Sequence, residues 1–371
     1  MKIPNGHEVI QLFEQFSPKG LAMEGDKIGL QIGRLNKKVE RIMIALDVLE
    51  NVIDEAIEKN VHLIIAHHPI IYRPLKNLLT DSVQGKIIEK LLKHDIAVYA
   101  AHTNLDVATG GVNDLLAEAL ELENTEVLVP TFETKLKKLV VFVPVSHAEE
   151  IRRVLGNAGA GFIGNYSHCS FSGSGTGRFL PGENTNPFVG EAGRLEEVEE
   201  VRLETIVPES ILKKTLTAMI KAHPYEEVAY DVYPLENKGE VLGLGRIGKV
   251  PEMTLEEFAE KVKKTLEVSH VRVVGDLSAK VKKVAVLGGD GNKYFMNAKY
   301  QGADVYVTGD IYYHTAHDAM MQGLNMIDPG HNVEKVMKKG LTTVLQKMCH
   351  DSGFEVEIFP SAENTDPFQF I

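Results

Sequence analysis

Apolar and polar positions alternate between strand-like and helical spacing along the first 120 residues. Short apolar runs at 41–46 and 63–66 have the length of buried strands, and apolar side chains recur at helical spacing over 51–59 between them. The alternation continues with a helix, a strand and a helix predicted at 85–93, 96–100 and 112–120. Strands that alternate with helices in this way predict βαβ units and a parallel sheet.

Residues 241–371 show the same kind of alternation. Strand-like runs occur at 283–287, 305–308, 325–328 and 354–359. Helical patterns lie between or after them, at 292–300, 313–322 and 331–348. Both ends of the chain therefore predict α/β structure, and we expect them to form one discontinuous, parallel-type α/β unit.

The middle of the chain has a different pattern. Its predicted elements are strands at 136–143, 164–179, 198–208 and 227–234, and helices at 148–157 and 211–222. The order β-α-β-β-α-β is typical of a ferredoxin-like fold, an antiparallel sheet covered by two helices. Gly239, Gly243 and Gly245 follow the last strand and suggest a boundary. We therefore expect a first α/β half at 1–134, an inserted domain at 135–240 and a second α/β half at 241–371.

Composition narrows the class of protein. The 371 residues are 44% hydrophobic and 25% charged, as in ordinary globular proteins, and the formal net charge of −12 opposes general nucleic-acid binding. No apolar run reaches the roughly 20 residues of a membrane span and no signal-type segment follows the N-terminus, so we expect a cytoplasmic protein without membrane contact. The two cysteines, Cys169 and Cys349, cannot build a cysteine-based zinc site, so His and carboxylates would have to hold any metal.

Candidate ligands follow two of the predicted strands in the first half. His67 and His68 come directly after the apolar run LIIA, and His102 and Asp106 follow the next strand in AAHTNLD. Ligands of parallel α/β sheets bind beyond the carboxyl ends of the strands. Alone, the paired histidines could be surface-loop residues and Asp106 a helix cap. His102 could be a metal ligand, a donor behind the ligands or a proton shuttle.

A third group of candidate ligands follows a predicted strand in the second half. His331 and Glu334 in DPGHNVEK are spaced i, i+3, so they share one helix face, although Glu334 could also serve the helix dipole. Together with the first two groups they give three histidines and two carboxylates, enough for two cations sharing a bridging group. Without cysteine, such a set suits Zn²⁺, Mn²⁺ or Fe²⁺.

Other motifs leave alternatives open. The GGDG segment, with Gly288, Gly289 and Gly291, could bind a phosphate through backbone N–H groups or simply make a tight turn. Asp26 could line the site, and His314 and His317 could lie near it or on an ordinary helix face. The hexapeptides ENTNPF and ENTDPF, at 183–188 and 363–368, share either turn chemistry or a common role.

Five segments resemble the Nif-three-like dinuclear-metal proteins, often called GTP cyclohydrolase 1 type 2 homologues, almost from end to end. They are GDKIGLQIG (25–33), IIAHHPIIYRPLK (64–76), AAHTNLDVATGGVND (100–114), VYVTGDIYYHTAHDA (305–319) and IDPGHNVEKV (327–336). The resemblance implies two divalent metal ions per chain, with zinc as first candidate and iron or manganese as alternatives. It implies that their ligands are His67, His68, Asp106, His331 and Glu334.

The middle segment is similar to PII- and CutA-type trimeric domains, which longer members of this family carry as an insertion. The resemblance also implies a homohexamer, a toroid built from trimers and dimers.

Two classes of function compete. The first is a metal-dependent hydrolase of a nucleotide or phosphorylated metabolite, with a small anionic substrate. Hydroxide would attack C8 of a GTP-type purine, His102 would transfer protons and the GGDG glycines would hold phosphates, or a phosphoester would be cleaved instead. The alternative is a non-enzymatic metal-handling or regulatory adaptor whose inserted domain senses a small molecule. DNA binding by a ring-shaped assembly is opposed by the negative charge.

Overall fold

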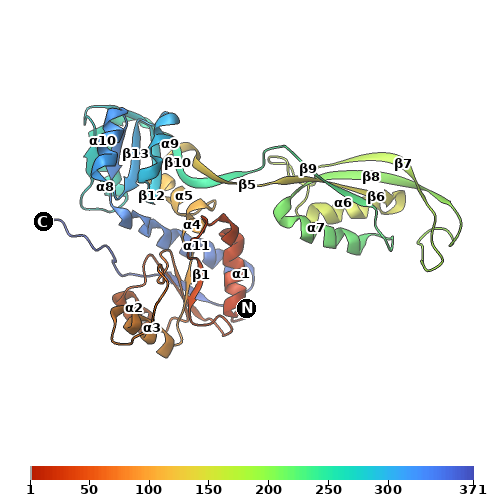
Figure 1. Ribbon diagram of the computed structural model, residues 1–371, viewed down its shortest axis with the longest axis horizontal. Helices are drawn as coiled ribbons and strands as arrows, with labels where there is room; N and C mark the ends of the chain where they lie inside the picture. The colour runs from red at the N-terminus through yellow and green to blue at the C-terminus, as the bar shows by residue number, and fades with distance from the viewer. Residues whose placement is uncertain (1) are drawn as a thin grey trace. The chain divides into compact units, whose positions relative to one another are not determined.

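The computed structural model describes residues 2–371, which fold as two compact units. Unit 1 combines the N-terminal segment up to Phe132 with Leu242–Ile371, and unit 2 is Glu133–Val241. Both units combine helices with strands (Figure 1), and parallel as well as antiparallel strand pairs occur in unit 1, so the predicted mixed α/β class is confirmed. Within residues 2–371, no helix is long and apolar enough to cross a membrane.

The first sheet of unit 1 has the strand order β1-β4-β3-β2-β15. Its strands are β1 (Gly29–Ile32), β2 (Arg41–Ala45), β3 (Leu63–Ala66), β4 (Ala97–Ala100) and β15 (Glu357–Pro360). Strands β15, β2, β3 and β4 are parallel, and β1 adds an antiparallel edge. Every residue of β3 and β4 is buried, which is why these strands read as unbroken apolar runs.

The second sheet of unit 1 has the order β11-β14-β13-β12-β10-β5. Its strands are β5 (Glu123–Glu133), β10 (Val241–Thr254), β11 (Arg272–Val274), β12 (Lys280–Asp290), β13 (Val305–Gly309) and β14 (Asn325–Asp328). Strands β12, β13 and β14 are parallel neighbours, whereas β11 and β10 pair antiparallel with β14 and β12. Each sheet therefore contains a block of adjacent parallel strands whose carboxyl ends share one edge.

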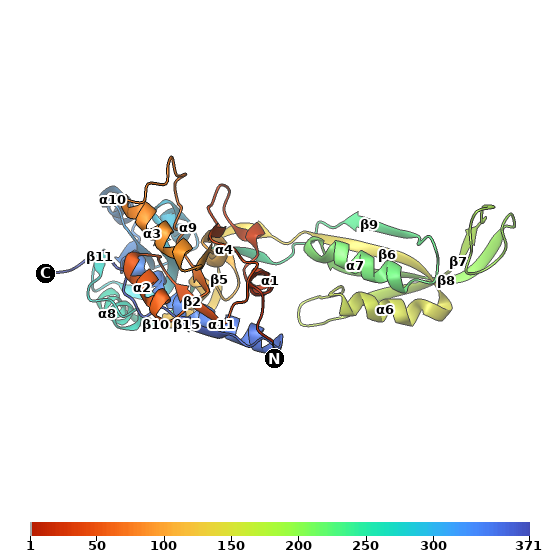
Figure 2. The ribbon, with the colours of Figure 1, turned by 90° about the horizontal axis from the view of Figure 1, so that it is seen from below.

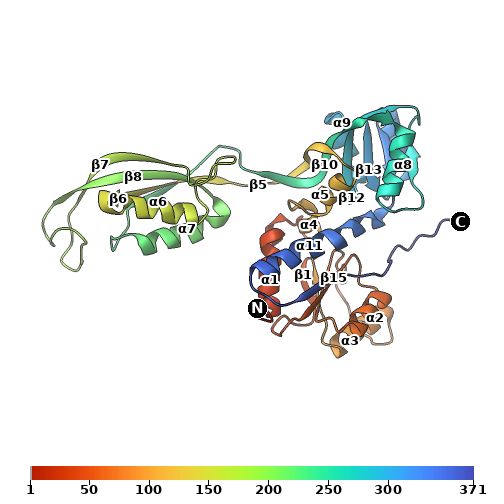
Figure 3. The same cartoon turned by 180° about the vertical axis from the view of Figure 1, so that it is seen from behind.

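Helices cover the faces of both sheets. They are α1 (Gly6–Phe16), α2 (Glu50–Glu58), α3 (Val83–Lys93), α4 (Thr103–Val107), α5 (Val112–Ala119), α8 (Leu255–Thr265), α9 (Phe295–Tyr300), α10 (Tyr313–Met321) and α11 (Val336–Asp351). One core joins the inner faces of both sheets with side chains of α1, α5, α8 and α11, and Figure 3 shows α11 running between the sheets. The outer face of the first sheet packs on α2 and α3, which lie side by side (Figure 2).

The glycines near the predicted boundary at residue 240 have a further role. Gly243 lies inside β10, where a Cβ atom would come within 2.0 Å of the Val129 carbonyl oxygen on β5. A Cβ atom on Gly239 would lie 2.0 Å from the Thr134 carbonyl oxygen. These glycines allow two backbones to approach closely, and such a need is invisible in sequence spacing.

Unit 2 contains β6 (Leu136–Pro144), α6 (Ala148–Asn157), β7 (Ser170–Phe179), β8 (Glu196–Pro208), α7 (Glu209–Ala222) and β9 (Tyr230–Pro234). Its sheet has the order β7-β8-β6-β9, and every neighbouring pair is antiparallel. Side chains such as Val141, Leu203 and Met219 form its core, where the sheet packs on α6 and α7. The two helices lie together on one face of the sheet (Figure 1), so the other face is not covered by a helix of this unit.

Candidate metal centre

Polar side chains gather where three parallel strands of the first sheet end. Asp47 follows β2, His67 and His68 follow β3, and His102 and Asp106 follow β4. Asp106 lies in the short helix α4, which the sequence did not predict. Because β2, β3 and β4 are neighbours in the sheet, their carboxyl ends bring these side chains together.

The second sheet supplies the opposing donors. Asp310 follows β13, and His331 and Glu334 lie in the 3₁₀ turn that follows β14 and leads into α11. In a 3₁₀ helix, residues i and i+3 are eclipsed, so both side chains of this turn point the same way. Glu334 Oε2 lies 3.1 Å from His68 Nε2, which brings the two sheet edges to a common site.

Glu334 is the centre of the donor array. Its Oε2 atom lies 3.2 Å from His331 Nε2 and 3.6 Å from His67 Nε2, in addition to its contact with His68. Asp106 Oδ1 lies 3.6 Å from His67 Nε2 on the other side. Among residues 2–371, three sets of side chains could hold a metal, and the donor atoms within each set lie within 4.8 Å of one another: His67, His68 and His102; His68, His331 and Glu334; and His67, Asp106 and Glu334.

Each histidine of the site is oriented through its Nδ1 atom. His68 Nδ1–H donates to Asp47 at 2.7 Å, His331 Nδ1–H to Asp310 at 2.6 Å, and His102 Nδ1–H to Asp26 at 2.9 Å. His67 Nδ1–H donates to the Ala101 carbonyl oxygen at 2.9 Å. With Nδ1 engaged, Nε2 is the atom left for a ligand, and such carboxylate–histidine pairs are characteristic of metal sites.

Two buried polar atoms at the site have no hydrogen-bond partner. They are His67 Nε2 and Asp106 Oδ1, and His67 is fully buried while Asp106 is 9% exposed. Buried side-chain donors and acceptors normally find partners, because leaving one unsatisfied costs about 1–3 kcal/mol. A divalent cation between them would satisfy both atoms, so the residues present fit a metal.

The electrostatics of the site follow from burying carboxylates among histidines. Burial raises the pKa of Asp106 to about 6 against the opposing charge of His67. Burial would also raise the pKa of Glu334, but His67, His331 and His68 together lower that pKa well below its ordinary value. Hydrogen bonding to Glu334 raises the pKa of His331 to about 9, despite burial. The metal-free site thus binds protons that a metal would displace.

The remaining sequence candidates differ in their positions relative to the donor sets. His102 belongs to one of the donor sets, with its ring centroid 5.3 Å from that of His67, so it lies among the candidate ligands and not behind them. Asp26 orients His102. His314 and His317 lie on α10 beside the exposed Tyr313 and belong to none of the donor sets formed by residues 2–371.

The GGDG glycines serve packing around the donors. The Gly288 and Gly291 N–H groups already donate to Asn113 Oδ1 and Thr308 Oγ1, so they are not free for a phosphate. A Cβ atom on Gly289 would lie 2.8 Å from Glu334 Oε1. The absence of side chains lets Glu334 approach the end of β12.

Sequence reasoning missed Asp47 and Asp310. Their signal was present, because each is a carboxylate placed one or two residues beyond a buried parallel strand. The C-terminal ENTDPF segment also reaches this region, where the Thr365 hydroxyl donates to Asp47 Oδ2. The related hexapeptide ENTNPF lies in unit 2, where the Thr185 hydroxyl donates to the Gly182 carbonyl.

Replacing Asp47 with alanine is expected to weaken metal binding about 10- to 100-fold, because His68 loses the acceptor that fixes its orientation. Thr365→Val removes only the hydroxyl behind Asp47 and should have a smaller effect in the same direction. Competition with a chromophoric chelator measures both affinities. Asp231→Ala, at an exposed carboxylate on β9 of unit 2, is the control. Equal affinity of the Asp47 variant and the control would show that this contact does not tune the site.

Comparison with known proteins agrees with this architecture. The family model of Duf34/NIF3 (NGG1p interacting factor 3) matches residues 4–367. Proteins from Bacillus subtilis and Halalkalibacterium halodurans, each called GTP cyclohydrolase 1 type 2 homolog, are 64% and 60% identical and align over 100% of both chains.

Solved structures give the same result. A crystal structure of a Bacillus cereus protein related to NIF3 has a TM-score of 0.96 at 64% identity, and a Staphylococcus aureus protein has 0.80 at 33%; both comparisons cover 100% of each chain. The resemblance noted in the sequence motifs is thereby confirmed. With a family match over nearly the whole sequence and full-length relatives of 60% identity or more, the chain belongs to the Duf34/NIF3 family.

Proposed function

We propose that the candidate centre holds two divalent metal ions and that the protein is a metal-dependent hydrolase of a nucleotide or phosphorylated metabolite. The observation that carries this proposal is the pair of buried, unpartnered donors, His67 Nε2 and Asp106 Oδ1, within an array of convergent Nε2 and carboxylate atoms. The nitrogen and oxygen donors, without sulfur, suit zinc, with iron or manganese as alternatives.

The proposed ligands are His67, His68, Asp106, His331 and Glu334. Glu334 would be shared, since three histidine Nε2 atoms surround its carboxylate. Bound divalent ions supply Lewis acidity and lower the pKa of water. His102, held by Asp26, would accept or return a proton through Nε2, although its position also suits a ligand. The Nδ1 partners keep the other histidines in the tautomer that presents Nε2.

The substrate class rests on the relatives, which are called GTP cyclohydrolase 1 type 2 homologs. Metal-loaded protein should open the purine ring of GTP, and Asp106→Asn should lower the rate at least about 100-fold, because metal-assisted water activation is lost. Absorbance of the purine measures ring opening, and a phosphate assay detects the rival phosphoester hydrolysis. Equal rates for the wild type and Asp106→Asn in both assays would remove the hydrolase proposal.

The finer features implied by the resemblance complete this proposal. We infer a ferredoxin-like, PII- and CutA-related inserted unit, supported by its strand and helix order and antiparallel sheet. We also propose a cytoplasmic homohexamer with a small anionic substrate. The second candidate function, a metal-handling or regulatory adaptor, is favoured by one observation: unit 2 contains a cavity of its own.

A further inference from the structure

A cavity of about 740 Å³ lies wholly within unit 2. Its walls include Phe142 on β6, Phe179 at the end of β7, and Glu200 and Arg202 on β8. Val141 and Leu203 belong to the core shared with α6 and α7, and alternate residues of a strand point to opposite faces. Phe142 and Arg202 therefore lie on the face of the sheet that these helices leave uncovered. Cavities of this size are typical of sites for small organic ligands.

Alternate glycines of β7 create the open space. Gly173 and Gly175 pair with Arg202 and Glu200 on β8 and share their face of the sheet. A Cβ atom on Gly173 or Gly175 would meet no other atom within 4 Å, so these two positions open into the cavity. Gly177 differs, because a Cβ atom there would lie 2.3 Å from Glu200 Oε2. The glycines of the SGSGTG segment thus leave the cavity free of side chains and leave space for the Glu200 carboxylate.

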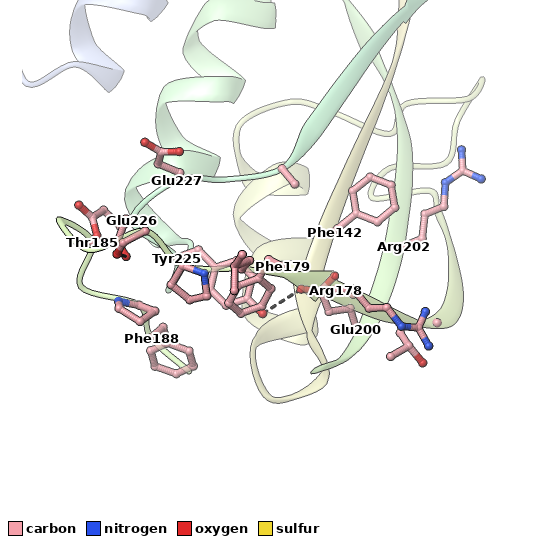
Figure 4. A pocket seen from close by; sticks show the side chains of 18 of the residues that line it. Phe142, Arg178, Phe179, Thr185, Phe188, Glu200, Arg202, Tyr225, Glu226 and Glu227 are labelled. Carbon is pink, nitrogen blue, oxygen red and sulfur yellow. Dashed lines mark hydrogen bonds between the residues drawn. The ribbon is translucent and has the colours of Figure 1, made fainter. Parts of the chain in front are cut away.

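Glu200 is the distinctive polar group of this cavity. It is 8% exposed, and its Oε1 atom accepts the Tyr225 hydroxyl at 2.8 Å, as the dashed line in Figure 4 shows. Burial and the Glu200 carboxylate raise the pKa of Tyr225, so this hydroxyl stays a donor. A carboxylate has about four acceptor positions, so Glu200 can accept further N–H groups.

Aromatic rings surround this carboxylate. The ring centroid of Tyr225 lies 6.0 Å from that of Phe179 and 6.2 Å from that of Phe188, and these side chains gather around the cavity in Figure 4. The Glu226 carboxylate accepts the Asn186 N–H at 3.0 Å and so fastens the segment that carries Phe188. At these separations, and with interplanar angles of 58° and 50°, the rings pack against one another, so a flat ligand would lie beside them and not between them.

The charged side chains that line the cavity disfavour an anionic ligand. The two arginines of the wall have glutamate partners of their own: Arg178 Nε donates to Glu197 at 2.8 Å and Arg202 lies 3.2 Å from Glu204. Among residues 2–371, none of the ion pairs within 4.0 Å includes Glu200 or Glu227, which also line the cavity. A neutral or cationic ring that donates hydrogen bonds complements these walls better than a phosphate or a carboxylate.

We propose that this cavity binds a small planar nitrogen heterocycle whose adjacent N–H donors, such as those of a guanine-type edge, meet the Glu200 carboxylate beside the aromatic rings. Two parallel N–H groups match the two oxygens of one carboxylate, which is a strong and geometrically specific pairing. The site is independent of the metal centre in unit 1, since none of its residues is a candidate metal ligand.

Equilibrium dialysis of the full-length protein tests this site, with guanosine, inosine and GTP as probes. Guanosine should bind, and inosine should bind at least about tenfold more weakly because it lacks the exocyclic amine. Once a chelator has removed any metal from the centre in unit 1, the phosphates of GTP should not improve binding. Glu200→Gln should weaken guanosine binding at least about tenfold because one acceptor becomes a donor. Gly175→Val should do the same by filling the cavity, and valine suits a strand.

Two controls separate the outcomes. Ser172→Val lies on the opposite face of β7 outside the cavity and should bind guanosine like the wild type. Glu334→Gln should also bind guanosine normally, so the loss of the metal centre would not be mistaken for the loss of binding in the cavity. Three results would overturn the proposal: no guanosine binding to the wild type, normal guanosine binding to Glu200→Gln, or normal guanosine binding to Gly175→Val. The last result, together with a change of oligomeric mass in Gly175→Val, would identify this face as an interface between copies of the chain.

Discussion

Replacing Glu334 with glutamine is expected to reduce the bound metal from about two ions per chain to well below one. Glu334 is 3% exposed, and its Oε2 atom lies 3.1–3.6 Å from the Nε2 atoms of His68, His331 and His67. Glutamine keeps the size of the side chain but removes the negative charge that would bridge two cations. Metal content after purification, measured by inductively coupled plasma mass spectrometry, gives the stoichiometry.

The matched control is Glu118→Gln, which makes the same chemical change at an exposed position of α5. Far-ultraviolet circular dichroism should be the same for both variants and the wild type, since neither substitution changes a helix or strand. A full complement of metal in the Glu334 variant would show that this carboxylate is not a ligand. Its role would then be limited to hydrogen bonding with the histidines.

Replacing Arg246 with methionine is expected to lower the free energy of unfolding by about 3–5 kcal/mol. Arg246 is 5% exposed and lies on β10, where its guanidinium pairs with both carboxylate oxygens of Asp114 on α5. It also donates to the carbonyl oxygens of Gly243 and Gly245 at 2.9 and 2.8 Å. Methionine fills much of the volume but takes the guanidinium donors from both carbonyl oxygens and leaves Asp114 only the Gly110 N–H. Urea unfolding followed by circular dichroism measures the loss.

An exposed arginine provides the comparison for Arg246. Arg34 lies 3.3 Å from Asp95, with 69% of its side chain exposed, and Arg34→Met should cost less than about 1 kcal/mol. If both variants unfold at the same urea concentration as the wild type, the buried pair does not hold β10 to α5.

The sequence indicates the position of the candidate centre because of sheet geometry. The runs LIIA and AVYA are apolar throughout, which marks them as strands buried on both faces, and such strands are parallel neighbours here. The side chains that follow them must then meet at one edge. The same reasoning places His331 and Glu334 after β14. That these residues bind metal stays a prediction, although their convergence is a property of the fold.

Other parts of the site could not be predicted from spacing. The approach of one sheet edge to the other, which brings Glu334 to His68, depends on long-range packing through the shared core around α5 and α11. The roles of Gly243 and Gly289 depend on which backbone or side chain lies against them. Asp47 and Asp310 were overlooked because a carboxylate after a strand is also an ordinary turn or cap residue.

The dinuclear centre can be tested by anomalous diffraction from crystals of the protein, grown without chelator and measured at the zinc, iron and manganese absorption edges. We expect two anomalous peaks, both bounded by donors of His67, His68, Asp106, His331 and Glu334, and the absorption edges identify the element. The absence of any peak among these donors in crystals soaked with zinc, iron and manganese in turn would contradict the dinuclear centre and the hydrolase proposed from it.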